Sequence, residues 1–502
     1  MATLSPYTTI KPTFGAMPTW MTSTDDAERI MAYQRYEEMY WNDPQGYKLI
    51  LRGSEANPVY IPSAMTIVEA CNRYLAKNWT FVADPKLGTP AERELLSQIM
   101  TPLFRREEVW TKFLTQKRYG LIRGDAMWFI AADPTKLPGR RLRLVELDPG
   151  SYFPINDPVD EERTIGCHIV EQKYSADGKD LMIKRQTYRK TETGAITYEL
   201  SWWELGGWDD RNLDPKDLKP TTKIPPSPAV APTALPPLIT ALPVYHIRNQ
   251  RSGALFGSSE MRGMETLAAA ISQTVSDDEL ALALAGLGIY VTTSGPPVNS
   301  ETGEEENWKI GPGFVAEIDP ETDFKRVPGV TSVQASLDHV RFMQGAMREA
   351  RGIPDVAVGT VDVSVAESGI ALALKMAPIL SSNAEKEQEM LSVYDHLLYD
   401  LTTMWMPSYE ATNFGAAVPV SVVDDPLPVN REKTVAEIAL LVEKRFITIE
   451  YGRQLLSEKL GYEFPASMGE AVVDEMTALA AARNSDPFLD RLGRELDAGA
   501  PA

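Results

Sequence analysis

The sequence has few of the residues that build most catalytic and metal centres. Only two cysteines occur among 502 residues, Cys71 and Cys167, and no CxxC pair is present. This excludes a disulfide framework and a cysteine-rich metal site, and it fits a reducing compartment. The four histidines occur in unrelated settings, with no HExxH helix and no GxSxG elbow. We expect all four to be structural: His168, His246, His339 and His396.

Basic residues are also few relative to acids. The chain has 50 lysines and arginines against 70 acids, a formal charge of -20. A broad basic surface that grips nucleic acid is therefore not expected, and any contact with DNA should be local or weak.

Long apolar runs are missing as well. The longest, LALALAGLGIYV at residues 280–291, is shorter than the roughly 20 residues that cross a bilayer. The first residues lack the basic and then apolar plan of a secretory signal. We expect a chain that is neither exported nor membrane-spanning.

The composition that is present, 43% apolar and 24% charged, is typical of a folded protein with more than one core. STDDAERIMAYQRYEEMYW, with Ser23 or Thr24 as N-cap, and IPSAMTIVEACNRYLAKNW both have the apolar spacing of amphipathic helices. A third helical region at residues 89–119 should be interrupted near Pro102. The first part of the chain is therefore predicted to begin with helices.

From residue 125 the apolar period changes to that of strands. AMWFIAAD, RLRLVELD, TIGCHIVEQKY, LMIKRQTYRK and AITYELSWWEL predict an antiparallel meander, and helices followed by a sheet predict an α+β module. Nine prolines then follow between Pro215 and Pro243. They indicate either an extended connector on the surface or at a subunit boundary, or a flexible linker.

The second half is mostly helical. Ser258 or Ser259 should cap a helix that runs to about residue 285, a short β-like insert follows, and a second helix covers residues 333–351. After a valine-rich loop, a long helix should be kinked at Pro378. A final helical pair turns near residues 446–448, where Thr448 can cap the second helix.

Two stretches invite a catalytic interpretation. HIRNQRSGALFGSSEM, residues 246–261, is a basic, glycine-containing loop before a helix, but it lacks the lysine of a P-loop and the tight glycine pair of a dinucleotide fingerprint. We favour a plain helix start there. Asp148, Asp157 and Asp160 are loosely spaced enough for a two-metal nuclease, but Asp-Pro pairs are better turn formers. The acidic run at 304–306 is predicted to be a solvated tip.

One charge pattern is suited to nucleic acid. Arg341 and Arg348 are seven residues apart and Arg351 is three further on, a spacing that predicts a basic stripe on one helix. Phosphates would fit that stripe. The alternative is a solvated face with ion pairs to Asp338 or Glu349.

The order of these parts resembles phage portal proteins, more narrowly the portals of long-tailed siphoviruses that infect actinobacteria. The resemblance covers roughly residues 25–480. It depends on the joint order of five segments: GDAMWFI, LVELDPGSYFPINDP, PVYHIRNQRSGALFGSSEM, ESGIALALKMAPI and FITIEYGRQLLSEKLGY.

The resemblance implies an α+β portal-like fold with an α/β wing, two long stem helices that bracket a small clip, a kinked tunnel helix and a helical crown. The implied parts are an N-terminal arm (1–24), a wing (25–245) with the proline-rich connector (209–243), a first stem helix (246–287), a clip (288–332), a second stem helix (333–352), a tunnel loop (353–367), a kinked helix that returns to the wing (368–430), a crown (431–483) and a flexible tail (484–502). The glycine loop would then turn the chain from wing into stem.

The function that this resemblance implies is a twelve-membered ring at one capsid vertex, assembled in the host cytoplasm, through which double-stranded DNA enters and leaves. Its partners would be other copies of the chain, the DNA, the major capsid protein, a scaffolding protein, the terminase large subunit and a head-tail adaptor. No cofactor, metal, membrane or catalysis is implied. The alternatives are a metal-dependent nuclease, a packaging motor component or another head-tail adaptor ring.

Two sets of residues are candidates for the channel wall. The first consists of side chains that would touch DNA lightly or prevent sticking: Arg341, Arg348, Arg351, Asp277, Asp278 and Glu279. The second consists of tunnel-loop valines that either line the narrowest point or pack against a neighbouring subunit: Val356, Val358, Val361, Val363 and Val365.

Overall fold

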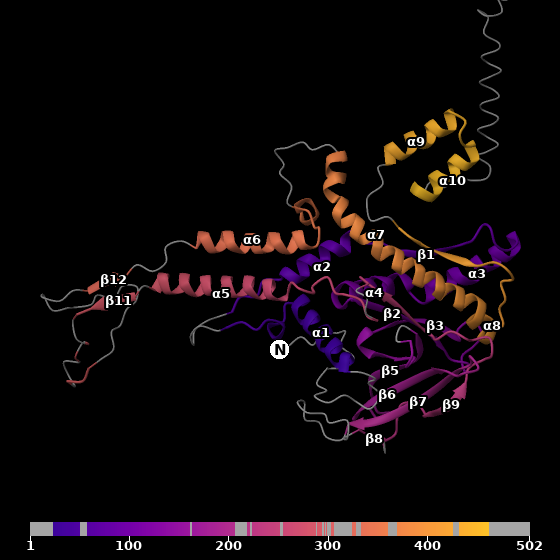
Figure 1. The fold of residues 1–502 in the computed structure, drawn as a ribbon, viewed down its shortest axis with the longest axis horizontal. Helices are drawn as coiled ribbons and strands as arrows, with labels where there is room; N and C mark the ends of the chain where they lie inside the picture. The colour runs from indigo at the N-terminus through magenta and orange to yellow at the C-terminus, as the bar shows by residue number, and fades with distance from the viewer. Residues whose placement is uncertain are drawn as a thin grey trace, which may run out of the picture. The chain divides into compact units, whose positions relative to one another are not determined.

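The computed structural model describes residues 24–50, 58–160, 163–205, 218–220, 223–251, 255–287, 289–293, 296, 298, 303–305, 324–327, 333–359, 369–424 and 431–460. The chain divides into two compact units, Met1–Pro426 and Leu427–Ala502. Helices and antiparallel sheets alternate along the first unit, which confirms the α+β class (Figure 1). Among the described residues, no helix is both long and apolar enough to cross a membrane.

The first two helices form where the apolar spacing predicted them. They are α1 (Thr24–Tyr40) and α2 (Ser63–Arg73), and they contact each other. The predicted stripe of α1 is buried, namely Ile30, Tyr33, Tyr36 and Tyr40. These two helices cover part of the main core.

The third helical region is two helices, and the predicted break was misplaced. Helix α3 (Pro90–Arg106) begins with a capping box between Thr89 and Glu92, and it runs through Pro102. The chain turns at Glu108, whose φ of 51° ends the helical hydrogen bonding before α4 (Val109–Arg123). The buried Glu107 carboxylate pairs with Arg106 and with Lys112 of α4, so it joins the two helices across the turn.

The five β-rich runs all form strands, but in two sheets and not in one meander. The first sheet has the order β10-β2-β3, and the second β4-β5-β6-β7-β8, with β9 also paired to β7. The turn Pro149–Ser151, capped by Asp148, separates the sheets. The strands are β2 (Asp125–Ala132), β3 (Leu142–Leu147), β4 (Tyr152–Asn156), β5 (Thr164–Tyr174), β6 (Leu181–Lys190), β7 (Ile196–Leu205), β8 (Leu218–Pro220), β9 (Val230–Ala234) and β10 (Val244–Arg248).

The proline-rich segment lies along the edge of the second sheet. β8 pairs with residues 203–205 of β7, and β9 pairs with residues 197–200. The extended connector is therefore the correct alternative for the described residues of this segment. Because an edge position needs few backbone donors, prolines are tolerated there.

The main core lies between the helices and the first sheet. At its centre the Trp79 and Tyr394 rings stack with centroids 4.0 Å apart, and Trp128 lies edge-on to Trp79 at 5.1 Å. Trp79 belongs to β1 (Trp79–Ala83), which pairs with β13 (Pro419–Val423). Tyr394 belongs to α7 (Gly369–Asp400), a helix that contains Pro378 and changes direction in its N-terminal part (Figure 1).

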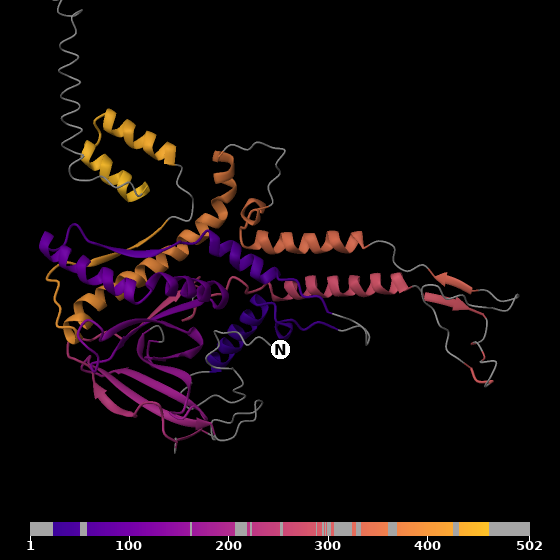
Figure 2. The same cartoon turned by 180° about the vertical axis from the view of Figure 1, so that it is seen from behind.

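Two further helices run side by side and antiparallel, α5 (Glu265–Leu287) and α6 (Gln334–Ala350), as both views agree (Figures 1 and 2). Between them in the chain lie the paired strands β11 (Ile289–Thr292) and β12 (Phe324–Val327). After α6 come the short helix Asp355–Val358 and then α7, which continues into a π-helical turn (Leu401–Trp405) and α8 (Met406–Tyr409).

The second unit contains α9 (Arg431–Glu443) and α10 (Ile449–Leu460). The Thr448 hydroxyl accepts a hydrogen bond from the Tyr451 amide at 3.2 Å, which confirms the predicted cap.

The stability of the second sheet should fall in acid because of one histidine. His168 of β5 is buried, with Nδ1 2.9 Å from the Thr187 hydroxyl, and burial lowers its pKa to about 4, with Arg185 and Arg189 acting in the same direction. Since the unfolded state takes up the proton first, stability present at neutral pH is lost as the pH falls from about 6.5 towards 4, by up to about 3 kcal/mol.

Urea unfolding of the wild type and of His168→Gln at pH 7.5, 6 and 5 measures this effect. The variant should lose less stability between pH 7.5 and 5 than the wild type. An equal loss in both proteins would show that His168 does not cause the dependence.

Candidate functional site: the helix pair and its buried junction

The described residues of the glycine-containing loop before α5 pack against backbone. The backbone N–H of Gly257 donates to the Asp125 carboxylate at 2.7 Å, and the backbone N–H of Asn249 donates to the Gly124 carbonyl at 2.8 Å. A Cβ on Gly257 would overlap the Gly124 carbonyl oxygen. Glycine is needed here because two backbone segments cross. The backbone N–H of Gly257 is already hydrogen-bonded to the Asp125 carboxylate, so a phosphate would have to displace that carboxylate.

Ser258 and Ser259 do not cap α5, which corrects the expected helix start. The Ser259 hydroxyl donates to the Ile122 carbonyl at 2.5 Å and accepts from the Met261 amide at 3.0 Å. These bonds hold a turn against the end of α4, and α5 begins only at Glu265. The loop therefore attaches α5 to the first sheet before the helix starts.

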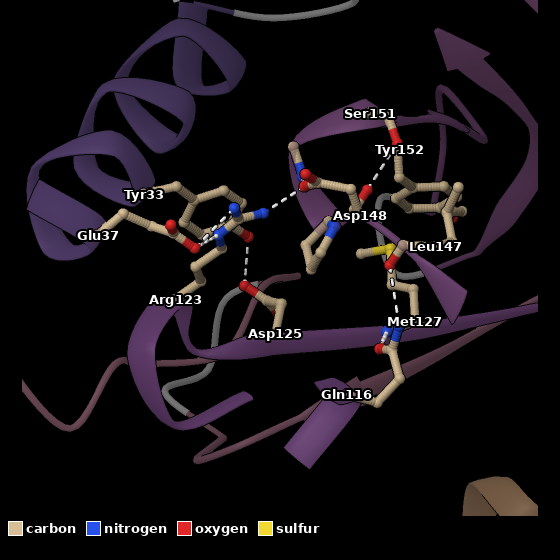
Figure 3. Close-up of polar contacts among 12 residues, drawn as sticks. Tyr33, Glu37, Gln116, Arg123, Asp125, Met127, Leu147, Asp148, Ser151 and Tyr152 are labelled. Atoms are coloured by element: carbon tan, nitrogen blue, oxygen red, sulfur yellow. Dashed lines mark hydrogen bonds and ion pairs between the residues drawn. The ribbon is translucent and has the colours of Figure 1, made fainter. Parts of the chain in front are cut away.

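Asp148, the first residue of the suggested metal cluster, belongs to a buried ion-pair network (Figure 3). Arg123 contacts the Glu37 carboxylate at 2.7 Å and pairs with Asp148 on its other side. Asp125 lies beside them, and its carboxylate accepts from Tyr33 and lies 2.6 Å from Nε2 of His246. Glu37 and Asp148 share the one buried guanidinium of Arg123, which joins α1, α4 and the turn after β3.

The other acidic candidates do not converge either. Asp157 accepts from the Val159 amide at 2.9 Å and lies 3.7 Å from Arg163. Among the described residues, no group of three or more His, Cys, Asp or Glu side chains is placed to hold a metal ion. Glu304 and Glu305 are exposed, as predicted for a solvated tip, while the third acid of that run lies outside the described residues.

The two remaining histidines lie on helix surfaces. His339 of α6 stacks on Phe342, with ring centroids 6.4 Å apart. His396 is exposed on α7. With His168 bonded to Thr187 and His246 to Asp125, the four lie in separate structural settings.

A second buried network forms the base of the helix pair, and sequence reasoning missed it. Glu260 is 1% exposed, and its carboxylate contacts Lys386 of α7 and the Asn249 side chain, both at 2.7 Å. Arg351, at the end of α6, lies 3.8 Å away and donates to the Arg262 carbonyl at 2.8 Å. One carboxylate thus joins the residue after β10, the loop before α5, the end of α6 and the middle of α7.

Cys71 of α2 borders this junction. Its sulfur lies 3.9 Å from the Glu260 carboxylate, and burial raises the pKa of the thiol to about 12. The Asn383 side chain donates to the Cys71 carbonyl at 3.2 Å. Cys71 is therefore a packed side chain, and its thiol is not a nucleophile.

The three arginines of the predicted stripe do not share one face. At about 100° per residue, Arg341 and Arg348 lie about 20° apart around α6, whereas Arg351 points toward the junction. Arg341 is exposed and pairs with Asp338 at 3.1 Å, and Arg348 pairs with Asp355 at 2.9 Å. Arg351 is held by Glu260 and backbone carbonyls, so its guanidinium is engaged within the chain.

The acidic candidates on α5 also diverge. Asp277, Asp278 and Glu279 are consecutive in one helix, so successive side chains leave it about 100° apart around its axis. Asp277 accepts from Gln273 at 3.0 Å, and Glu279 is exposed.

The valine-rich loop begins against the main core. Val356 and Val358 are half-buried and pack against that core, together with the buried Ala357 and Ile353. The remaining candidates, Val361, Val363 and Val365, lie outside the described residues. For Val356 and Val358 the structure shows contacts with the core of their own chain.

The sequence matches no protein-family model and no curated protein. Solved structures that are similar to this chain include the following three. The neck of an empty GTA particle, computed with C6 symmetry, has 14% identity and a TM-score of 0.43, and the match covers 79% of this chain and 90% of that one. The neck of a native GTA particle, computed with C12 symmetry, has 13% sequence identity and a TM-score of 0.44. The virion of a native gene transfer agent (GTA) particle has 11% sequence identity and a TM-score of 0.42. Each of these two matches covers 88% of this chain and 96% of the other.

Because the glycine loop crosses closely over Gly124, one methyl group added at Gly257 should lower the stability of the protein. Gly257→Ala should destabilise the protein by roughly 1–3 kcal/mol, because the backbones must separate. Gly120→Ala is the matched control: it lies in α4 nearby, and its Cβ would meet only Ala126 at 3.8 Å.

Urea unfolding midpoints measure both variants. Equal stability of Gly257→Ala and wild type would contradict the crossing. Inorganic phosphate should leave the melting temperature of the wild type unchanged, whereas a bound anion would raise it.

Proposed function

We propose that this chain is the subunit of a phage portal ring, a conduit for double-stranded DNA at one vertex of a capsid. The observation that carries the proposal is the helix pair. Helix α5 is apolar around its whole circumference in its last two turns, which read LALALAGL, and one neighbouring helix cannot cover it. Within the chain Leu282 remains 45% exposed, and Phe342 of α6 is 71% exposed.

A helix that is apolar on all sides is stable only when other elements surround it. The acids Asp277, Asp278 and Glu279 in the middle of α5 are unsuited to a lipid environment. Further copies of the same helix pair supply the missing cover. Head-to-tail contacts between identical copies close into a ring when the rotation allows, and a ring of helix pairs encloses a hole.

The order of elements supports the finer identification as a portal. Helices, two sheets, the strand β10, the helix pair with its short hairpin, a loop, the long helix α7 and a helical pair follow one another as in the family that the sequence resembles. In this proposal α5 and α6 are the stem, β11 and β12 belong to the clip, the segment after α6 is the tunnel loop, and α9 and α10 belong to the crown.

The charge of the chain suits a conduit. DNA that must move in and out cannot bind tightly, and a charge of -20 per subunit keeps phosphate contacts weak. The partners in this proposal are further copies, the DNA, the major capsid and scaffolding proteins, the terminase large subunit and a head-tail adaptor. The ring has no catalytic task, because terminase supplies the work of packaging.

Negative-stain images and mass photometry of the purified chain test the proposal. We expect rings with a central hole. Leu282→Glu should reduce the ring fraction strongly, because it places a charge on the apolar part of α5, whereas Leu137→Glu, at a 73% exposed leucine in a loop, should leave it unchanged. Monomers at every concentration would contradict the proposal.

Assays for ATP hydrolysis and magnesium-dependent DNA cleavage test the enzymatic alternatives. No turnover is expected, and clear turnover in either assay would show that a conduit is not the whole function.

A further inference from the structure

We infer that the outer face of α6 docks onto α5 of a second copy of the chain, with Gly345 at the point of closest approach and Arg341 paired with the acidic segment of that α5. This inference rests on the proposed ring. It adds which helix faces meet, and it gives Arg341 a partner other than DNA.

Helix α6 has two distinct faces. The inner face packs into the main core with α5 through Val340, Met343 and Met347, all buried. The residues on the opposite side follow one another at helical spacing, and each of them is exposed or half-buried. They are Asp338, Arg341, Phe342, Gly345 and Glu349.

Gly345 lies at the centre of this outer face. Glycine inside a helix is less stable than alanine, so it needs a reason. A Cβ at Gly345 would meet no atom within 4 Å among the described residues, and its backbone is helical. The part of the chain that the structure describes gives no steric reason for glycine here, and an element that approaches from outside the chain does.

Phe342 supports the same face. It is one turn from Gly345, and its side chain is 71% exposed although it lies in the middle of a helix. A large aromatic side chain beside a position without a side chain forms a projection next to a recess. This shape fits the surface of another helix.

Charge identifies which helix that is. Helix α5 carries four acids and no base, and α6 carries the bases Arg341 and Arg348 beside the acids Asp338 and Glu349. In a head-to-tail ring the two faces of a contact are different, so Arg341 on α6 of one copy can pair with an acid on α5 of the next. Arg348 is tied to Asp355, and Glu279 of α5 is exposed.

The ion pair that Arg341 forms with Asp338 within α6 does not compete strongly with this contact. Its partner Asp338 is one turn away on the same helix, and the two side chains are 71% and 59% exposed. Exposed pairs of this kind contribute little to stability. The guanidinium is therefore available to a carboxylate of a neighbouring copy.

A charge-swap mixture tests the contact directly. Arg341→Glu alone puts two acids opposite each other at every contact, and Glu279→Arg alone puts two bases there. Each variant should form rings at about one tenth of the wild-type yield or less. An equal mixture of the two proteins should restore ring formation, because alternating copies make every contact complementary.

The outcomes separate this inference from the proposed function. If the wild type and both single variants form rings equally well, the pairing is wrong while the ring stands, and a change only in DNA retention by Arg341→Glu would assign Arg341 to DNA. If the single variants fail and the mixture does not recover, the pairing is also wrong. A wild type that never forms rings contradicts the proposed function itself.

A second variant tests the close approach without charge. Gly345→Leu should keep the helical circular dichroism and melting behaviour of the monomer, because its Cβ position is open, but should abolish ring formation. Ala384→Leu, at an exposed position of α7, is the matched control and should assemble normally. Normal rings of Gly345→Leu would overturn the docking.

Discussion

The buried carboxylate of Glu260 determines how the helix pair is held. Its charge is compensated by Lys386 of α7, by the Asn249 side chain and by the guanidinium of Arg351 at the end of α6. Removing one member of such a group leaves a buried charge unpaired, which costs several kcal/mol. Four segments that are distant in sequence must therefore be in place together, and the direction in which α5 and α6 leave the core is set at this point.

The same principle operates beside the first sheet, where Arg123 of α4 pairs with Glu37 of α1 and with Asp148. Buried polar networks position the elements within one chain, while apolar side chains such as Phe342 and Leu282 stay on the outside of the helix pair. This division suits a ring subunit. In the proposed ring, a rigid base would present a defined surface to the next copy, and the negative charge of the chain would keep the conduit from binding DNA tightly.

Local patterns predicted what depends on neighbours in sequence. The stripe of α1 and the Thr448 cap were correct because a helix face and a helix start are local properties. The break before α4 was misplaced, because Pro102 is tolerated and the turn is instead fixed by the buried Glu107 pairs. The role of Ser259 depends on contacts with α4, and the orientation of Arg351 depends on Glu260, which no spacing in the sequence reveals.

Hydrogen–deuterium exchange of the intact chain, wild type against Glu260→Ala, tests the role of the junction most directly. We expect the last turn of α6, the middle of α7 and residues 249–264 to exchange faster together, because all of them share the carboxylate. Glu389→Gln, which alters the more exposed pairs with Arg248 and Arg251, should not cause this combined change. Faster exchange confined to the loop around residue 260 would contradict the claim that this one carboxylate holds the helix pair in place.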